Sequence, residues 1–154
     1  MGPILLFGNS QWKDFDMTVE VMAFEGGDDG FKVLFRATDA RNTYGVGFGS
    51  YRNQFHDIWS LDDGKWRALT SQASTNVPGT IEHGSWYHVR LSIRDNRFRC
   101  ELNGIPLFGV HDDAHNCGRV GFSTWDTLVR FRNVHVSGPR GGKLWQGLPV
   151  ISEG

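Results

Sequence analysis

The sequence predicts an all-β fold in which two antiparallel sheets pack face to face. The chain of 154 residues contains six tryptophans, eleven phenylalanines and 20 glycines. Aromatic residues favour strands, and glycine favours turns and crowded strands. Apolar and polar side chains alternate along many short segments, whereas the spacing of an amphipathic helix is nearly absent. Clusters of turn-forming residues separate these segments at short intervals.

Five segments alternate most clearly, with one apolar and one polar face, as in antiparallel sheets that are wet on one side. The expected strands are 15–24, 31–36, 44–49, 86–94 and 97–102. The residues expected to point inward are Phe15, Met17, Val19, Val21, Ala23, Phe31, Val33, Phe35, Tyr44, Val46, Phe48, Tyr87, Val89, Leu91, Ile93, Phe98, Cys100 and Leu102. About a dozen short strands in one domain predict two packed sheets, because each dry face needs a cover.

The last alternating segment, 128–136, changes phase. Val129 and Phe131 share one parity and Val134 and Val136 the other, which predicts a β-bulge near Arg132 and Asn133. From Gly138 onward the alternation ends. We therefore expect one sandwich domain over residues 1–137 and a C-terminal tail over 138–154, which can dock on the sandwich through Leu144 and Trp145.

Composition excludes several classes of protein. Sixteen basic and 17 acidic residues give a formal net charge of −1, which argues against a dedicated nucleic-acid binder. No apolar run approaches the roughly 20 residues of a membrane span. Cys100 and Cys117 form no CxxC pair, so a zinc site has no support. A buried free thiol is favoured over a disulfide for Cys100, which alternates with apolar neighbours.

Three segments carry a family resemblance: VLFRATDARNTYGVGF, GSWYHVRLSIRDNRFRCELNG and GRVGFSTWDTLVRFRNVHV. They resemble the concanavalin A-like, laminin G-like sandwich domains, and most closely the bacterial 3-keto-disaccharide hydrolase-type domain (domain of unknown function 1080) and levan-binding-type carbohydrate modules. The matching positions are Arg36, Tyr44, Trp86, Asn103, Gly104, Gly118, Gly121 and Phe131–Asn133. The likeness covers roughly residues 15–137 and implies a jelly-roll sandwich.

The resemblance, together with a glycine-lined strand face and the tryptophans and arginines near it, favours a non-catalytic carbohydrate-binding module, part of a larger protein, whose partner is an oligo- or polysaccharide. An extracellular or periplasmic location follows if that protein is exported. A glycoside or 3-keto-disaccharide hydrolase is the alternative, with Asp57 and His56 as acid and base. However, the acidic Glu-x-Asp-x-x-Glu cluster of related glycosidases is missing. Glu20 and Glu25 lie on opposite strand faces, whereas hydrolysis needs two carboxyls on one side of a cleft. A protein-interaction domain is the third possibility, if exposed aromatics form one flat patch.

Arg36 and the neighbouring glycines are the first candidates for a ligand site. Arg36 is expected to face outward with Lys32 and Leu34, on the sheet face that the resemblance associates with sugar contacts. Its guanidinium can donate paired hydrogen bonds to hydroxyls or a carboxylate, and a cross-strand salt bridge is the structural alternative. Gly45, Gly47 and Gly49 leave one strand face bare, either for a ligand or for a covering segment such as the one around Trp145.

The stretch SYRNQFHDIWSLDDGKW supplies the second group of candidates. Trp59 either packs in the core or presents a flat ring for a sugar to stack on. Arg52 and His56 are expected to precede the strand in a loop that can present them. Trp66 is expected to pack over the following hairpin.

Trp125 and Asp126 lie in the turn STWDT, where stacking and hydrogen-bond acceptance can combine. Asp126 can equally close the turn through its own backbone, as aspartates in turns do.

No cofactor is expected. The paired acids of GGDDG, LDDG and VHDDAHN are the possible calcium ligands, but none of these runs supplies six to eight oxygens. The outward residues Lys32, Arg36, Arg90, Arg99, Arg130 and Arg132 predict either a face for acidic glycans or, preferably, a salt-bridge ladder with Asp16, Glu20 and Glu101.

Overall fold

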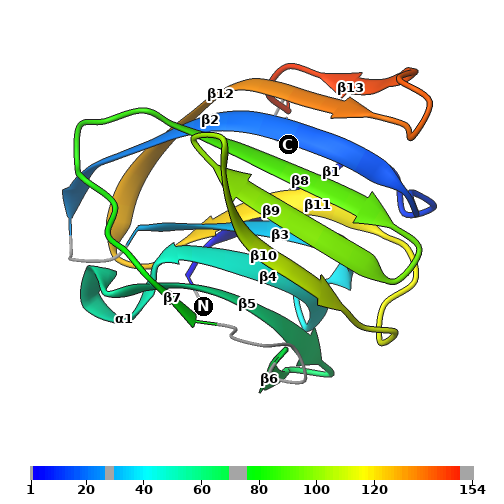
Figure 1. The fold of residues 1–154 in the computed structure, drawn as a ribbon, viewed down its shortest axis with the longest axis horizontal. Coiled ribbons are helices and arrows are strands. Elements are labelled where there is room, and N and C mark those ends of the chain that lie inside the picture. The colour runs from blue at the N-terminus through cyan, green and yellow to red at the C-terminus, as the bar shows by residue number, and fades with distance from the viewer. Residues whose placement is uncertain (1, 27–29, 70–75, 150–154) are drawn as a thin grey trace, which may run out of the picture.

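A computed structural model of the chain describes residues 2–26, 30–69 and 76–149. Two antiparallel sheets form the two layers of a sandwich (Figure 1). Sheet A contains the strands β1 (Ile4–Phe7), β11 (Arg119–Thr124), β3 (Phe31–Asp39), β4 (Asn42–Gly49), β5 (Phe55–Asp62) and β6 (Lys65–Ala68) in that spatial order, with β7 (Asn76–Pro78) also paired to β5. Sheet B contains β10 (Ile105–His111), β9 (Arg97–Leu102), β8 (Tyr87–Arg94), β2 (Phe15–Gly26), β12 (Thr127–Ser137) and β13 (Lys143–Gln146). The predicted all-β, jelly-roll sandwich is confirmed.

The core lies between the sheets, and the alternation identified it well. Every residue expected to point inward is buried in it except Tyr87, which packs against it while half-buried. The stacked rings of Phe35 and Tyr44, with centroids 5.2 Å apart, continue onto Phe98 of the other sheet. Both cysteines are free thiols, and Cys100 is buried as expected.

The predicted bulge in β12 is confirmed. The register of β12 against β2 shifts between Arg132 and His135, and Asn133 has a φ of 54°. The extra residue lets Phe131 and Val134 both serve the interior although their parity differs. Phe131 stacks on Phe122 with centroids 4.0 Å apart.

The segment after residue 137 adds a strand to sheet B. His135 pairs with Gln146 and Val136 with Trp145 along the edge of β12. The ring of Trp145 lies 5.3 Å from that of Phe7 and packs against the core, whereas Leu144 is exposed. Trp145 therefore docks the segment onto the sandwich. The segment does not cover the glycines of β4, because Trp59 and Asp57 of β5 lie over them.

Charged side chains on the outer face of sheet B pair with one another. Arg94 binds Asp16 at 2.8 Å and Arg132 binds Glu20 at 2.6 Å. Arg132 also lies over the ring of Trp86, at 3.6 Å from its centroid. These ion pairs agree with the predicted salt-bridge ladder on the outer face of sheet B. Among the described residues, no helix has the length and apolarity of a membrane span.

Candidate functional site

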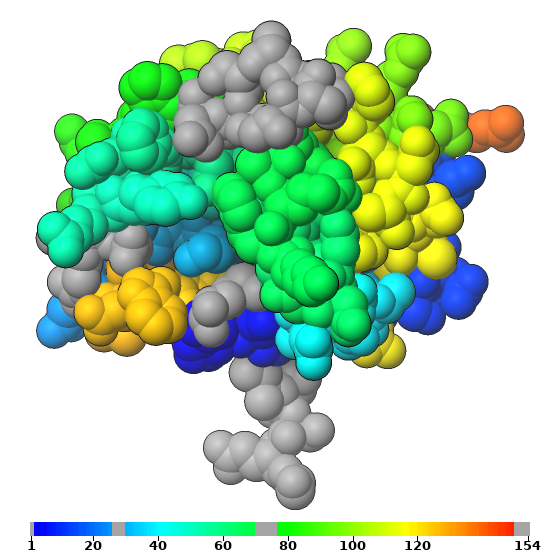
Figure 2. Space-filling view, turned by 90° about the horizontal axis from the view of Figure 1, so that it is seen from below, coloured from blue at the N-terminus to red at the C-terminus, as the bar shows by residue number. Residues whose placement is uncertain are grey.

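A pocket of about 420 Å³ opens on the outer face of sheet A. Its side-chain lining includes Lys32, Tyr51, Asp57, Trp59, Trp66 and Trp125, and we refer to it as the aromatic pocket. Figure 2 looks onto this face, where the teal segment of α1 (Ser50–Asn53), the green β5–β6 hairpin and the orange β11–β12 turn lie around the hollow. Three separate connections of the sandwich thus form the walls, and β3, β4 and β5 form the floor.

The register of the floor strands explains which side chains meet. Lys32 of β3 pairs with Gly47 of β4, which pairs with Asp57 of β5. In the next outer row, Leu34 pairs with Gly45 and Gly45 with Trp59. Side chains in one cross-strand row share one face of a sheet. Lys32 and Asp57 therefore lie on either side of a glycine.

The glycines of β4 make room for side chains of β5. A Cβ atom at Gly45 would collide with the ring of Trp59, and one at Gly47 would collide with Oδ1 of Asp57. Trp59 is only 4% exposed although it belongs to the outer face. The bare strand face expected from the sequence is therefore a cradle for Trp59 and Asp57, which form the floor of the pocket.

Replacing Gly45 with alanine is expected to lower the free energy of unfolding by about 1–3 kcal/mol, because the new methyl group displaces the Trp59 ring. Urea denaturation followed by tryptophan fluorescence measures the loss. Gly109→Ala is the matched control, since a Cβ atom there meets nothing within 4 Å. Equal stability of the two variants would contradict the cradle.

Asp57 is the most unusual ionisable group of the pocket, with 4% of its surface exposed. Burial raises the pKa of this carboxyl, while a hydrogen bond from Ser50 and the charge of Lys32 oppose that rise in part. The Ser50 hydroxyl donates to Oδ1 of Asp57 at 2.9 Å. The carboxyl is thus oriented from one side and desolvated, as acids in binding and catalytic sites often are.

The α1 segment places Ser50 and Tyr51 through an unusual backbone. Tyr51, Arg52 and Asn53 have φ values of 52°, 59° and 61°, so the turn is left-handed, a conformation that costs free energy for non-glycine residues. The Asn53 side chain holds it, donating to the carbonyl of Ile81 at 2.8 Å and accepting from its N–H at 2.6 Å. Asn53 thus fixes the left-handed turn at the wall of the pocket.

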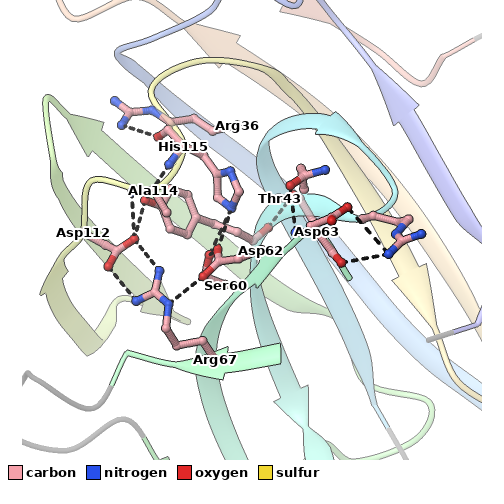
Figure 3. A network of polar contacts seen from close by, with 12 residues as sticks. Arg36, Thr43, Ser60, Asp62, Asp63, Arg67, Asp112, Ala114 and His115 are labelled. Atoms are coloured by element: carbon pink, nitrogen blue, oxygen red, sulfur yellow. Dashed lines mark hydrogen bonds and ion pairs between the residues drawn. The ribbon is translucent and has the colours of Figure 1, made fainter. Parts of the chain in front are cut away.

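An ionic network holds the hairpin that carries Trp66. Arg67 points to the other side of β6, where it donates to both oxygens of Asp112 at 2.8 and 2.9 Å and to Asp62 at 2.7 Å (Figure 3). The Tyr44 hydroxyl donates to the same Asp112 at 2.7 Å. These bonds join the hairpin to the loop after β10. Trp66 itself is 52% exposed and faces the pocket.

Two of the six predicted ligand residues, Trp59 and Trp125, line the aromatic pocket. Trp59 forms the floor and Trp125, 55% exposed, stands at the β11–β12 turn. Asp126 is exposed beside it, with a φ of 49°. Arg52 is exposed in α1 and borders a neighbouring depression with Asn53, Ile81 and His83.

The outward placement expected for Arg36 is wrong. Arg36 is 2% exposed, and its guanidinium donates to the carbonyl of Lys13 at 3.0 and 2.8 Å and to that of His115 at 3.3 Å. It also lies over the ring of Phe98 in the core, 5.2 Å from the centroid. Its φ of 50° and the register shifts of β3 on both sides mark a bulge, which turns the side chain away from the outer face.

The loop position expected for His56 is also wrong. β5 begins at Phe55, so His56 lies within the strand, 4% exposed, and its Nδ1 accepts the N–H of Gly49 at 3.2 Å. Burial lowers the pKa of this imidazole. Because His56 and Asp57 are adjacent in a strand, they face opposite sides and form no acid–base pair.

Of the six side chains named above as lining the pocket, four were not among the predicted ligand residues: Lys32, Tyr51, Asp57 and Trp66. Alternation places Lys32 on an outer face but leaves open which face Asp57 occupies, and the pairing register of β3, β4 and β5 brings the two residues together. Trp66 faces the pocket instead of packing over its hairpin. No sequence signal predicts the left-handed turn at Tyr51.

The structure also bears on two other kinds of site, a nucleophilic triad and a metal site. Ser60, His115 and Asp62 lie together, but Ser60 Oγ and Asp62 Oδ1 both approach Nε2 of His115, at 3.0 and 3.2 Å. A nucleophilic triad needs the acid on the opposite ring nitrogen. Within residues 2–26, 30–69 and 76–149, no three His, Cys, Asp or Glu side chains are grouped as metal ligands. The central residues of the GGDDG turn lie outside those ranges.

Several solved structures share this fold. Carbohydrate-binding module CBM66 from Bacillus subtilis superposes with a TM-score of 0.74 at 19% identity, covering 88% of this chain and 83% of that one. A homodimeric agglutinin from chicken liver gives a TM-score of 0.64 at 11% identity, with 88% and 100% coverage. A galectin from Caenorhabditis elegans gives 0.60 at 12% identity, with 88% and 90% coverage.

Sequence comparison adds an enzyme and a family. An extracellular exo-alpha-L-arabinofuranosidase from Streptomyces chartreusis is 28% identical over 106 residues, which is 69% of this chain and 12% of that enzyme. The chain thus spans about an eighth of that relative. The family model of the 3-keto-alpha-glucoside-1,2-lyase-like domain matches residues 3–137, which confirms the resemblance seen in the sequence. The chain belongs to the family of 3-keto-alpha-glucoside-1,2-lyase-like domains.

Proposed function

We propose that this chain is a non-catalytic carbohydrate-binding domain that holds an oligo- or polysaccharide in the aromatic pocket. The single observation that carries the proposal is the convergence of Trp59, Trp66 and Trp125 on one concave surface beside Lys32 and Asp57. Aromatic rings offer flat apolar surfaces on which the C–H face of a sugar can stack, and a few polar groups fix its orientation. The similar structures include a carbohydrate-binding module and a galectin, which supports the same proposal.

Calorimetric titration with a panel of plant and bacterial oligosaccharides tests this proposal. We expect Trp66→Ala and Trp125→Ala each to weaken binding at least tenfold, as loss of an aromatic anchor does. Trp86→Ala is the matched control, because Trp86 stacks with Arg132 on sheet B, away from the pocket. Circular dichroism checks that each variant folds. The proposal fails if no saccharide binds or if both pocket variants bind like the unmodified protein.

An enzymatic function is the second candidate, and Asp57 is the observation that favours it. A desolvated carboxyl with a raised pKa can act as a general base at a C–H next to a carbonyl, which is the step an elimination from a keto-sugar requires. Asp57 is the one acid among the described residues that line the pocket, so paired-carboxylate hydrolysis lacks its second group. Turnover of a 3-keto-glucoside by the purified protein, abolished in Asp57→Asn, would replace the binding proposal with this one.

The remaining candidate, a protein-interaction domain, required one flat apolar patch. The exposed aromatics Tyr51, Trp66 and Trp125 instead border a concavity whose floor carries two charged groups. Such a surface suits a small polar ligand better than a flat protein interface.

A further inference from the structure

We infer that the aromatic pocket selects neutral saccharides with adjacent hydroxyl groups over acidic saccharides, and that Asp57 and Lys32 make this selection. The inference rests on the proposed saccharide-binding function and specifies its ligand class. Its basis is the placement of one buried acid and one base across a glycine on the floor of an otherwise aromatic pocket.

The first step concerns the geometry of the floor. Lys32 and Asp57 lie two strands apart, about 10 Å between their backbones, since neighbouring strands are about 4.8 Å apart. Gly47 itself has no side chain, and the space beside it is occupied by Oδ1 of Asp57 and Oγ of Ser50. The acceptor Asp57 and the donor Lys32 therefore both line the bottom of the pocket.

The second step concerns hydrogen bonding. An ionised carboxylate only accepts hydrogen bonds, and an ammonium only donates them. A pair of adjacent sugar hydroxyls can satisfy both at once, with one hydroxyl donating to Asp57 and its neighbour accepting from Lys32. The Ser50 hydroxyl holds Asp57 Oδ1 at 2.9 Å, so the acceptor is already oriented before a ligand enters.

The third step concerns charge. Asp57 is almost completely buried, and burial already disfavours its ionised form. A uronate or sulfate placed beside it would add like-charge repulsion where water screens poorly. A neutral hydroxyl supplies the hydrogen bond without a second negative charge. Because Lys32 would attract an acidic sugar, the balance between the two residues decides the preference.

Matched pairs of ligands test the inference at neutral pH and physiological salt. Binding of a glucoside and the corresponding glucuronide, and of a galactoside and the corresponding galacturonide, is measured by calorimetry. We expect the neutral member of each bound pair to bind at least tenfold more tightly. Asp57→Asn, which keeps the shape of the side chain, is expected to reduce this ratio at least tenfold. Asp113→Asn is the control, because Asp113 is exposed in the loop after β10.

A second variant covers the case in which Asp57→Asn does not fold. Lys32→Met removes the attraction for acids and is expected to raise the neutral-to-acidic ratio about tenfold. Binding of neither member of any pair would overturn the proposed function, and this inference with it. Saccharide binding without a neutral preference, or a preference unchanged in Asp57→Asn or Lys32→Met, would overturn the inference alone.

Discussion

Replacing Arg36 with alanine is expected to lower the free energy of unfolding by about 3–5 kcal/mol, as removal of one partner from a buried charged network does. The guanidinium is 2% exposed and binds the carbonyls of Lys13 and His115, with Asp14 at 3.4 Å. Without it, buried carbonyl oxygens lose their donors and a cavity opens beside Phe98. Denaturation in urea, followed by circular dichroism, measures the loss.

Two further variants sharpen this result. Arg36→Lys keeps the charge but not the planar fork of donors, so we expect it to recover only a small part of the stability. Arg99→Ala, on the outer face of sheet B, is the control and is expected to change stability by less than about 0.5 kcal/mol. A stable Arg36→Ala variant that had lost saccharide binding would return Arg36 to the binding site.

Replacing Asp112 with asparagine is expected to lower the free energy of unfolding by about 2 kcal/mol at neutral pH. Burial raises the pKa of this carboxyl, but the hydrogen bonds from Arg67 and Tyr44 outweigh that effect and hold it at about 2, below its usual 3.8. A shift of this size corresponds to about 2 kcal/mol of stability. Asparagine cannot carry the negative charge that makes these bonds strong.

The sign of the shift makes this contribution pH-dependent. Because the pKa of Asp112 is lowered in the folded state, its stabilising effect is complete above pH 3.8 and is lost as the pH falls towards 2. Urea midpoints of the unmodified protein and Asp112→Asn should therefore differ at pH 7 and converge only as the pH falls to about 2. Asp113→Asn is the matched control and should not alter the curve. A constant difference at all pH values would contradict the ionic role of Asp112.

Alternation predicted the core well because it reports which face of a strand a residue occupies. Phe15 to Ala23 in β2 and Tyr44 to Phe48 in β4 follow it without exception. Alternation was misleading for side chains that lie on the outer face of a sheet and are nevertheless buried. Leu34 lies on the outer face of sheet A, in the same cross-strand row as Gly45 and Trp59, yet is fully buried. Arg36 departs for another reason, since a bulge reverses its side chain.

The candidate site was harder to predict because its parts meet through register and turns. Lys32, Gly47 and Asp57 come from three strands, and parity alone does not align them. Tyr51 depends on a left-handed turn that non-glycine residues rarely adopt. Trp59 and Trp125 could be found because a large flat aromatic ring is the side chain on which a sugar stacks. The other side chains of the pocket, Lys32, Tyr51, Asp57 and Trp66, could be identified only from the three-dimensional structure.

The strand β13 has a consequence for any attempt to excise or fuse this domain. The family match ends at residue 137, whereas β13 covers residues 143–146 and caps the edge of β12. A fragment cut at residue 137 would expose the unpaired N–H and C=O groups of β12 at the rim of sheet B, together with the surface under Trp145. Uncovered strand edges recruit other chains and promote aggregation. A recombinant boundary or an inter-domain linker therefore belongs after Gly147, whose N–H donates to the carbonyl of Val134 and whose carbonyl accepts from the indole N–H of Trp145.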